Sequence, residues 1–406
     1  MNIGLMRKLD YWLGQPLCFL LSIINGFAKC IGVRKKRDKK RIPQKILLIK
    51  LSEMGAIILS YPLIRQIKNA QPSVDIFFLT FKRNKDVFRA LGAAIPEQKV
   101  ITISENSSGL FIIDVLKAIH KIRKEKIDVL IDLELFSRFT AIAGYLTGIP
   151  KRIGFHRYTF EGLYRGNLLT HNVLYNPLLH ISKIYLSLGP LVWTEKKSTP
   201  ELNEKVDDDA LILPQFTTTK EQQKHLWDKL REYNFNEKDY LLLINPGEGV
   251  LPQREWPLNQ FIDLAKRFLK ETEKNCVIIV GTESGTRKAN ELFKELKGMR
   301  SANLTGKTSL TDLLTLFNIA QVLVANDSGL GHLAALTDIR KIIIFGPESP
   351  LVYAPLGENT QIIYSHLPCS PCFSALNHRK SACRDNQCLE AIKVEDVYYA
   401  IKNNLR

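Results

Sequence analysis

Residues 322–336 of the chain read Val-Leu-Val-Ala-Asn-Asp-Ser-Gly-Leu-Gly-His-Leu-Ala-Ala-Leu. The segment begins with a short apolar run, which is typical of a buried strand, and ends in apolar residues at helical spacing. Between them stand Asn, Asp, Ser and Gly, which favour turns and helix starts. The pattern predicts a strand, a tight loop and a helix in succession, which is part of a βαβ unit in a parallel sheet.

The same alternation extends in both directions from this segment. In the second half we expect strands at 240–245, 276–281, 321–325 and 341–345, and helices at 258–271, 285–296, 310–318, 330–336 and 394–403. In the first half we expect strands at 46–50, 75–80, 100–103, 128–133 and 152–155, and helices at 56–68, 85–91, 110–125 and through 145.

The two halves are separated by residues 194–219, which contain Pro200 and Pro214 and show no sustained period. The boundary divides the chain into two α/β domains, 42–205 and 206–406, each with a doubly wound, Rossmann-like sheet. Two such domains in tandem leave a cleft that faces the carboxyl ends of both sheets. Ligands bind at this edge in doubly wound folds, so we expect the site there.

The composition excludes several classes of protein. Of the 406 residues, 45% are hydrophobic and 24% charged, which is typical of globular proteins and not of disordered or fibrous ones. After the N-terminus almost no stretch approaches the length of a spanning helix, so a polytopic membrane protein is excluded. The formal charge is +16, and residues 1–41 hold ten basic and two acidic residues, a net +8.

Residues 1–41 are predicted to be a basic, amphipathic segment at a membrane interface. Residues 11–28 carry no charge, but Gly14 and Pro16 make them a poor spanning helix. After Pro16, one narrow polar stripe crosses an apolar helix; it consists of Ser22, Asn25, Gly26 and Lys29. The basic residues of 34–41 would add attraction to anionic lipid, on the order of 1 kcal/mol per residue near the surface.

Residues 1–41 have other possible roles. A cleaved signal peptide needs a small-residue cleavage site, and the basic octamer 34–41 stands there instead. A nucleic-acid arm would have interleaved aromatic residues, so no nucleic-acid partner is expected. If the helix spans, the positive charge keeps the body of the protein in the cytoplasm. A helix packed on the protein's own surface, followed by a solvated basic linker, stays an alternative to a peripheral position on the cytoplasmic face of the inner membrane.

Three predicted strands of the second half end in glycine-containing loops before helices. Such loops let a ligand approach the backbone, and helix N-termini attract anions. No loop has the P-loop pattern and no Gly-x-Gly-x-x-Gly follows the first strand of either domain, so a dinucleotide cofactor is not indicated. Together the loops indicate a nucleotide-diphosphate site. We assign to it Gly247, Arg254, Glu283, Asp327, Ser328, Gly329 and His332.

Structural alternatives exist for several of these residues: a turn residue for the glycines, a surface charge for Arg254, and a helix cap or packed side chain for His332. Trp256 is expected in the core.

Several motifs resemble glycosyltransferase family 9, the ADP-heptose:lipopolysaccharide heptosyltransferases. The specific match is 324–336 with Ile-Phe-Gly-Pro at 344–347; weaker matches are 48–55, 245–247, 254–257 and 304–308. The resemblance covers about residues 45–400. It implies a GT-B fold, an acceptor in the first domain and a nucleotide sugar in the second. It also implies a cytoplasmic, inverting, metal-independent transfer to a lipid-linked or lipopolysaccharide-core acceptor.

Carried over by position, the resemblance implies that Asp327, Ser328, Gly329 and His332 face the sugar and diphosphate and that Arg254 contacts a phosphate.

The chain departs from the family after the first strand. The family pattern there is Ser-x-x-Gly-Asp, and its Asp is the expected general base; this chain has Ala56, which cannot accept a proton. Two carboxylates are candidates for the role, Glu53 in the same loop and Glu134 after strand 128–133. The alternatives are a helix-start carboxylate for Glu53 and a salt bridge to Arg138 for Glu134.

Four of the seven cysteines lie near the C-terminus: Cys369, Cys372, Cys383 and Cys388. Their spacing is compatible with one structural Zn²⁺, and reduced thiols that pack a loop are an equal alternative. No cofactor is required by the proposed chemistry.

Two further functions stay open at this point: a nucleotide-sugar epimerase, and a catalytically degenerate protein that binds sugar nucleotides.

Overall fold

The computed structural model describes residues 3–31, 42–156, 164–194, 206–247 and 251–405. The chain divides into two compact units, Met1–Leu211 and Ile212–Arg406. The expected domain boundary at 205 adjoins residues 195–205, which lie outside the described residues. The N-terminal helices belong to the first unit and do not form a unit of their own.

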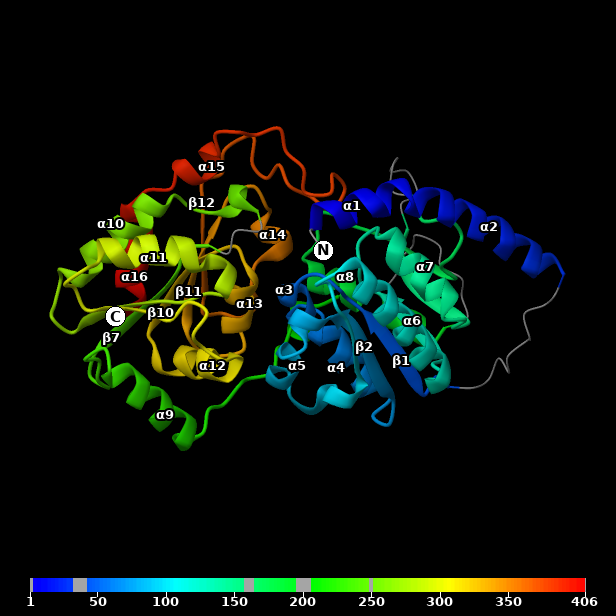
Figure 1. Cartoon of the computed structure of the whole chain (residues 1–406), viewed down its shortest axis with the longest axis horizontal. Helices are drawn as coiled ribbons and strands as arrows, with labels where there is room; N and C mark the ends of the chain where they lie inside the picture. Colours follow the sequence, from blue (N-terminus) through cyan, green and yellow to red (C-terminus); the bar gives the residue numbers. More distant parts are fainter. Residues whose placement is uncertain (1–2, 32–41, 157–163, 195–205, 248–250, 406) are drawn as a thin grey trace. The chain divides into compact units, whose positions relative to one another are not determined.

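The first unit contains a parallel sheet of six strands in the order β3-β2-β1-β4-β5-β6 (Figure 1). Its strands are β1 (Lys45–Ile49), β2 (Asp75–Phe81), β3 (Val100–Ile103), β4 (Val129–Asp132), β5 (Lys151–His156) and β6 (His171–Leu174). Its later helices are α3 (Met54–Ile58), α4 (Tyr61–Ala70), α5 (Val87–Ala90), α6 (Ser108–Glu125), α7 (Arg138–Leu146) and α8 (Ile181–Leu186). The strand order reverses between β1 and β4, which makes their carboxyl ends the switch point of a doubly wound sheet.

The second unit repeats this topology with six parallel strands in the order β12-β11-β10-β7-β8-β9. The strands are β7 (Tyr240–Asn245), β8 (Asn275–Ile279), β9 (Ser301–Asn303), β10 (Val322–Asn326), β11 (Arg340–Phe345) and β12 (Thr360–Tyr364). The helices are α9 (Lys220–Arg231), α10 (Leu258–Leu269), α11 (Thr286–Glu295), α12 (Leu310–Ile319), α13 (Gly329–Ala334), α14 (Pro350–Tyr353), α15 (Gln387–Glu390) and α16 (Val394–Leu405). Its switch point lies between β7 and β10.

The fold expected from the sequence is confirmed, with differences at particular elements. The predicted single helix 56–68 is wrong, because the chain forms α3 and α4 with a break at Ser60 before Pro62. Proline has no N–H to donate and favours a helix start, so it divides the apolar pattern. Three strands and the helices α8, α9, α14 and α15 were not predicted. The missed strands are β6, β9 and β12, and all three lie at sheet edges.

Two N-terminal helices, α1 (Ile3–Trp12) and α2 (Gly14–Cys30), pack against α7 of the first unit. Figure 1 shows them in dark blue along one side of this unit. Among the described residues, Leu5–Ala28 is the one segment that is long and apolar enough to cross a membrane by length and composition. The basic residues of 34–41 lie outside the described residues.

Candidate functional site

Each sheet places candidate residues at its switch point. In the first unit, Glu53 follows β1 as the N-cap of α3, and Glu134 follows β4. In the second unit, Arg254 follows β7, while Asp327 and Ser328 follow β10. Because β1 pairs with β4 and β7 pairs with β10, the loops within each pair emerge side by side. This is the edge at which doubly wound folds bind ligands.

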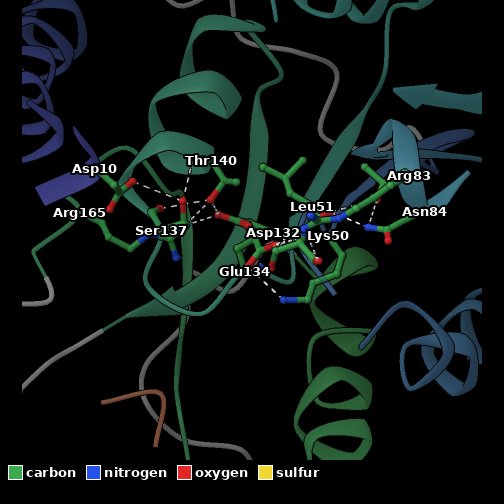
Figure 2. A network of polar contacts seen from close by, with 12 residues as sticks. Asp10, Lys50, Leu51, Arg83, Asn84, Asp132, Glu134, Ser137, Thr140 and Arg165 are labelled. Carbon is green, nitrogen blue, oxygen red and sulfur yellow. Dashed lines mark hydrogen bonds and ion pairs between the residues drawn. The ribbon is translucent and has the colours of Figure 1, made fainter. Parts of the chain in front are cut away.

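Both oxygens of the Glu134 carboxylate are engaged by the chain after β1 (Figure 2). Oε1 accepts hydrogen bonds from the backbone N–H groups of Leu51, at 2.7 Å, and Ser52, at 3.3 Å. Oε2 lies 3.0 Å from Nζ of Lys50. The salt bridge to Arg138 that the sequence offered as an alternative is replaced by this pair with Lys50, because Arg138 pairs with Asp10 instead.

The carbonyl groups of Leu51 and Ser52, in the loop after β1, are also held by hydrogen bonds. Nδ2 of Asn84 donates to the Leu51 carbonyl at 2.7 Å, and the Arg83 guanidinium donates to the Ser52 carbonyl at 3.0 Å. Residues 51 and 52 are therefore held through both their N–H and their C=O groups. Backbone polar groups satisfied in this way give a rigid loop, so the residue that follows has a defined position.

Glu53 is the residue that follows this clamped stretch. It is half-buried, and its backbone is extended (φ −125°, ψ 118°) at the start of α3. Its side chain makes no capping hydrogen bond to α3, so the helix-start alternative has no cap contact to support it. Ala56 is half-buried in the first turn of α3, three residues after Glu53.

A buried acid, Asp132, lies at the end of β4 behind Glu134. Asp132 forms an ion pair with Arg165, accepts a hydrogen bond from Thr140 Oγ1 at 2.8 Å, and accepts one from the Glu134 N–H at 3.0 Å. Burial raises the pKa of Asp132, while Arg165 and the hydrogen bond from Thr140 oppose this rise. Sequence analysis missed this group; an acid inside an otherwise apolar predicted strand was the available signal.

In the second unit, the structure brings Arg254 and Asp327 together. A guanidinium nitrogen of Arg254 lies 2.5 Å from Oδ2 of Asp327, whose side chain is 2% exposed. Arg254 is therefore not the solvated surface charge considered above. A charge-assisted pair of this kind fixes the guanidinium in place.

Polar atoms around this pair are buried without a hydrogen-bond partner within the described residues. They are Ser328 Oγ, Asn326 Nδ2 and Asn245 Oδ1, all at the carboxyl ends of β7 and β10. Asn326 is otherwise held, because its Oδ1 accepts from the Trp256 N–H at 2.8 Å. Buried polar atoms in native proteins are normally paired, so a cluster of unpaired ones marks a place where a ligand can supply the partner.

The remaining donor candidates lie nearby on the same sheet edge. Gly247 has φ +134°, which favours glycine, and a side chain there would meet Glu255. Gly329 is the first residue of α13, and His332 lies one turn further and is buried. Since Ser328 occupies the N-cap, His332 is not the helix cap. Glu283 is exposed in the loop after β8, the strand that pairs with β7.

Trp256 is 1% exposed, as expected for the core.

The four C-terminal cysteines are free thiols that range from exposed Cys369 to buried Cys388. Burial raises the pKa of Cys388. The nearby Cys372, and to a smaller extent Cys369 and Cys383, raise it further. Within the described residues, no group of three or more His, Cys, Asp or Glu side chains is placed to hold a metal ion.

Comparison with known proteins places these features in a family. The model of glycosyltransferase family 9 (heptosyltransferase) matches residues 115–382. The lipopolysaccharide heptosyltransferase 2 of Salmonella typhimurium is 25% identical over 325 residues, which cover 79% of this chain and 87% of that protein.

Among solved structures, the ADP-heptose lipopolysaccharide heptosyltransferase II of E. coli is similar, with a TM-score of 0.67 at 20% identity over 89% of this chain and 98% of that one. A family 9 glycosyltransferase from Veillonella parvula has a TM-score of 0.69 at 17% identity, over 91% of this chain and 99% of that one. Both show the GT-B fold.

Proposed function

Because the chain belongs to glycosyltransferase family 9 (heptosyltransferase), we propose that it transfers heptose from ADP-heptose to a lipopolysaccharide core or a related lipid-linked acceptor. The names of its relatives support both the sugar and the acceptor. The donor would bind the second unit and the acceptor the first. Family membership favours transfer over the epimerase and binding-protein alternatives.

The observation that carries the proposal is the Arg254–Asp327 pair at the second switch point, beside a Ser328 hydroxyl that is buried without a hydrogen-bond partner among the described residues. We assign the diphosphate to Arg254 and the N–H groups at the start of α13, and hydrogen bonding of the donor to Ser328. Gly247, Glu283, Gly329 and His332 complete the donor site. A guanidinium and helix-end amides can stabilise the charge that develops on a leaving diphosphate without a metal ion.

For the acceptor, we assign the general base to Glu53 and its positioning to Glu134. The Glu53 carboxylate would take the proton from the acceptor hydroxyl as its oxygen forms a bond to the anomeric carbon. The bond between that carbon and the diphosphate oxygen breaks, and ADP leaves with the electron pair, so the configuration inverts. Glu134 is less suited to this role because its oxygens already accept from Lys50, Leu51 and Ser52.

The proposal is tested by incubating the purified chain with a panel of nucleotide sugars, with and without a deacylated lipopolysaccharide-core acceptor. We expect ADP release from ADP-heptose that depends on the acceptor, and a product one heptose heavier. Conversion of the donor without acceptor would indicate an epimerase. Donor binding with no turnover would indicate a degenerate binding protein.

Two finer assignments belong with this proposal. The first is a position at the cytoplasmic face of the inner membrane, supported by the net +8 of residues 1–41 and the apolar stretch Leu5–Ala28. The second concerns the four C-terminal cysteines: their sequence spacing is compatible with a structural zinc, but no three such side chains among the described residues are placed to hold one, so reduced, packed thiols stay an equal alternative. Metal analysis of the gently purified chain tests it, and less than one zinc per chain excludes the site.

A further inference from the structure

Helix α2 packs on the first unit through polar side chains and through Cys18 and Leu21, which join an apolar cluster with residues of α7. Asn25 is fully buried, and its Nδ2 donates to the backbone carbonyl of Asn167 at 3.0 Å and to the Asn167 side chain at 2.8 Å. Ser22 Oγ accepts from the Asn167 N–H at 2.9 Å. Gly166 permits this approach, because a side chain there would lie 2.7 Å from the Cys18 carbonyl. Ser22 and Asn25 of the polar stripe therefore face the protein.

Most large apolar side chains of the two helices point outward, whereas Met6, Cys18 and Leu21 pack inward. Trp12 is 72% exposed, Phe19 60% and Phe27 64%, and Leu20, Ile23 and Ile24 are exposed beside them. A helix on the surface of a soluble protein has the reverse arrangement, with its apolar stripe on the core and its polar face in water. A continuous exposed apolar face of this extent marks an interaction surface.

Helix α1 is anchored at a separate place. The Asp10 carboxylate accepts from the Phe139 N–H at 2.7 Å and pairs with Arg138 at 3.4 Å. Arg138 itself is 1% exposed. The helix pair is thus tied to the first unit at Asp10 and again at Ser22 and Asn25, so it lies along this unit (Figure 1).

A second exposed apolar stretch lies on α6, a helix that contacts α7. The Phe139 ring, next to the Asp10 contact, lies 5.3 Å from the Phe111 ring at the start of α6. The first half of α6 exposes Leu110, Ile112, Ile113 and Leu116. Its second half exposes Lys117, Lys121 and Lys124. This helix therefore presents an apolar end and a basic end.

The exposed charged side chains of α1, α2 and α6 are basic. The acids of these helices are Asp10, Asp114 and Glu125, and each is engaged within the unit: Asp114 accepts from the Ser104 N–H at 3.0 Å, and Glu125 pairs with Lys45 at 2.9 Å. The exposed basic side chains include Arg7, Lys8 and the lysines of α6. An apolar face rimmed by positive charge is complementary to an anionic lipid monolayer.

We propose that the outward faces of α1, α2 and the first half of α6, called here the lipid-facing surface, lie flat in an anionic lipid monolayer with their basic residues at the headgroups. The inference rests on the membrane association proposed above and adds its contact residues and orientation. A flat orientation follows from the two anchors, because a helix held along the first unit does not cross the bilayer.

The first test is flotation of the full chain with vesicles of phosphatidylethanolamine and phosphatidylglycerol. We expect Phe19→Ser/Phe27→Ser to lower the bound-to-free ratio at least tenfold and Ile113→Ser/Leu116→Ser to lower it severalfold. The matched control Leu178→Ser/Tyr399→Ser removes side chains that are 82% and 61% exposed elsewhere, and should bind as the wild type does. If Phe19→Ser/Phe27→Ser binds vesicles as the wild type does, the proposed lipid-facing surface is wrong. If Ile113→Ser/Leu116→Ser does so, α6 is not part of that surface.

The second test measures depth by the quenching of tryptophan fluorescence with brominated lipids. The probes are Trp12 and tryptophans introduced at Phe19 or Phe27 in a Trp12→Phe background, and the signal of the Trp12→Phe chain, which keeps three other tryptophans, is subtracted. Equal, shallow quenching at the three positions supports the flat orientation. Quenching that shows a steadily changing depth from residue 12 to residue 27 indicates a spanning segment and contradicts the flat orientation. A dimer in lipid-free solution that the α2 variant dissociates, with vesicle binding unchanged, identifies a second copy as the occupant and also overturns it.

Transfer to a deacylated, soluble acceptor is measured in parallel on the same samples. Vesicle binding without transfer leaves the lipid-facing surface intact and counts against the proposed activity. Transfer without vesicle binding counts against the surface alone.

Discussion

Two carboxylates, Glu53 and Glu134, stand at the carboxyl edge of the first sheet, and their contacts differ. Glu134 accepts hydrogen bonds from two backbone N–H groups and pairs with Lys50. Glu53 follows the stretch that these contacts hold in place. A carboxylate that already accepts several hydrogen bonds is a weaker base and fixes the groups that donate to it, so we assign Glu134 to positioning the loop in which Glu53 lies.

The first prediction separates these roles by substitution. We expect Glu53→Gln to lower kcat roughly 100-fold or more, since general-base catalysis typically contributes that much, with ADP binding unchanged. We expect Glu134→Gln to lower kcat less, on the order of tenfold, and to lower the thermal stability, because the Lys50 charge loses its partner. Glu237→Gln, at a 68% exposed side chain, is the control. Near-normal turnover by Glu53→Gln would show that Glu53 is not the general base.

The second prediction concerns Arg254. Arg254→Lys keeps a positive charge opposite Asp327 but loses the planar fork that binds phosphate oxygens at two points. We expect ADP affinity to fall by roughly tenfold, which corresponds to about 1.4 kcal/mol, with an unchanged melting temperature. Isothermal titration with ADP measures it, with the more exposed Arg267→Lys as control. Unchanged ADP affinity would mean that Arg254 does not bind the diphosphate and only pairs with Asp327.

At the scale of elements, each sheet is buried from both faces, and this constrains the charges that its strands carry. Lys341 of β11 is 2% exposed and its Nζ donates to the Ile339 carbonyl at 3.0 Å. Burial lowers the pKa of Lys341 from 10.5 to about 8. The charged form is disfavoured in the fold because one carbonyl does not replace the hydration of an ammonium group.

The third prediction is a pH effect on stability. Between pH 8 and 10.5 the unfolded chain binds more protons at Lys341 than the folded chain does, so the free energy of unfolding rises with pH there. The change amounts to on the order of 3 kcal/mol. We expect Lys341→Met to remove this rise and to be more stable than the wild type near neutral pH. Urea unfolding of the chain and of the exposed-site control Lys274→Met measures it; the same slope in Lys341→Met would contradict the assignment.

At the scale of the whole molecule, the N-terminal helices, α7 and the loop after β1 belong to one connected set of polar contacts (Figure 2). Asp10 holds the start of α7, Thr140 of α7 binds Asp132, and Asp132 binds the backbone of Glu134. The lipid-facing surface and the candidate acceptor loop are therefore parts of the same packed unit. In the function proposed here, this would present the loop at a fixed height above the lipid that carries the acceptor.

The fourth prediction follows from deleting residues 1–41. We expect the truncated chain to move from the membrane pellet to the soluble fraction. We also expect its first unit to lose several kcal/mol of stability, because Arg138 and Asn167 lose Asp10 and Asn25 as partners. Fractionation, with separate calorimetric transitions for the two units, measures both effects. Unchanged fractionation would contradict the membrane role, and an unchanged first transition would contradict the docking.

Much of the fold could be predicted from the sequence because central parallel strands are continuous apolar runs. All five residues of β8 and all five of β10 are buried, and both strands were predicted. The edge strands β9 and β12 were missed: β9 spans only Ser301–Asn303, and no residue of β12 is fully buried. β9 is too short for an apolar run, and the residues of β12 are at most half-buried, so neither sequence carries a strong apolar signal.

The sequence by itself determined the α/β class, the switch-point loops and the residues offered for the donor, since these depend on local periodicity and turn chemistry. Tertiary structure alone decided which partners those residues have: Lys50 for Glu134, Asp327 for Arg254, and Asn167 for the polar stripe of α2. The direction in which a helix faces depends on contacts between residues far apart in the chain. For this reason the sequence could show the stripe but not that it points inward.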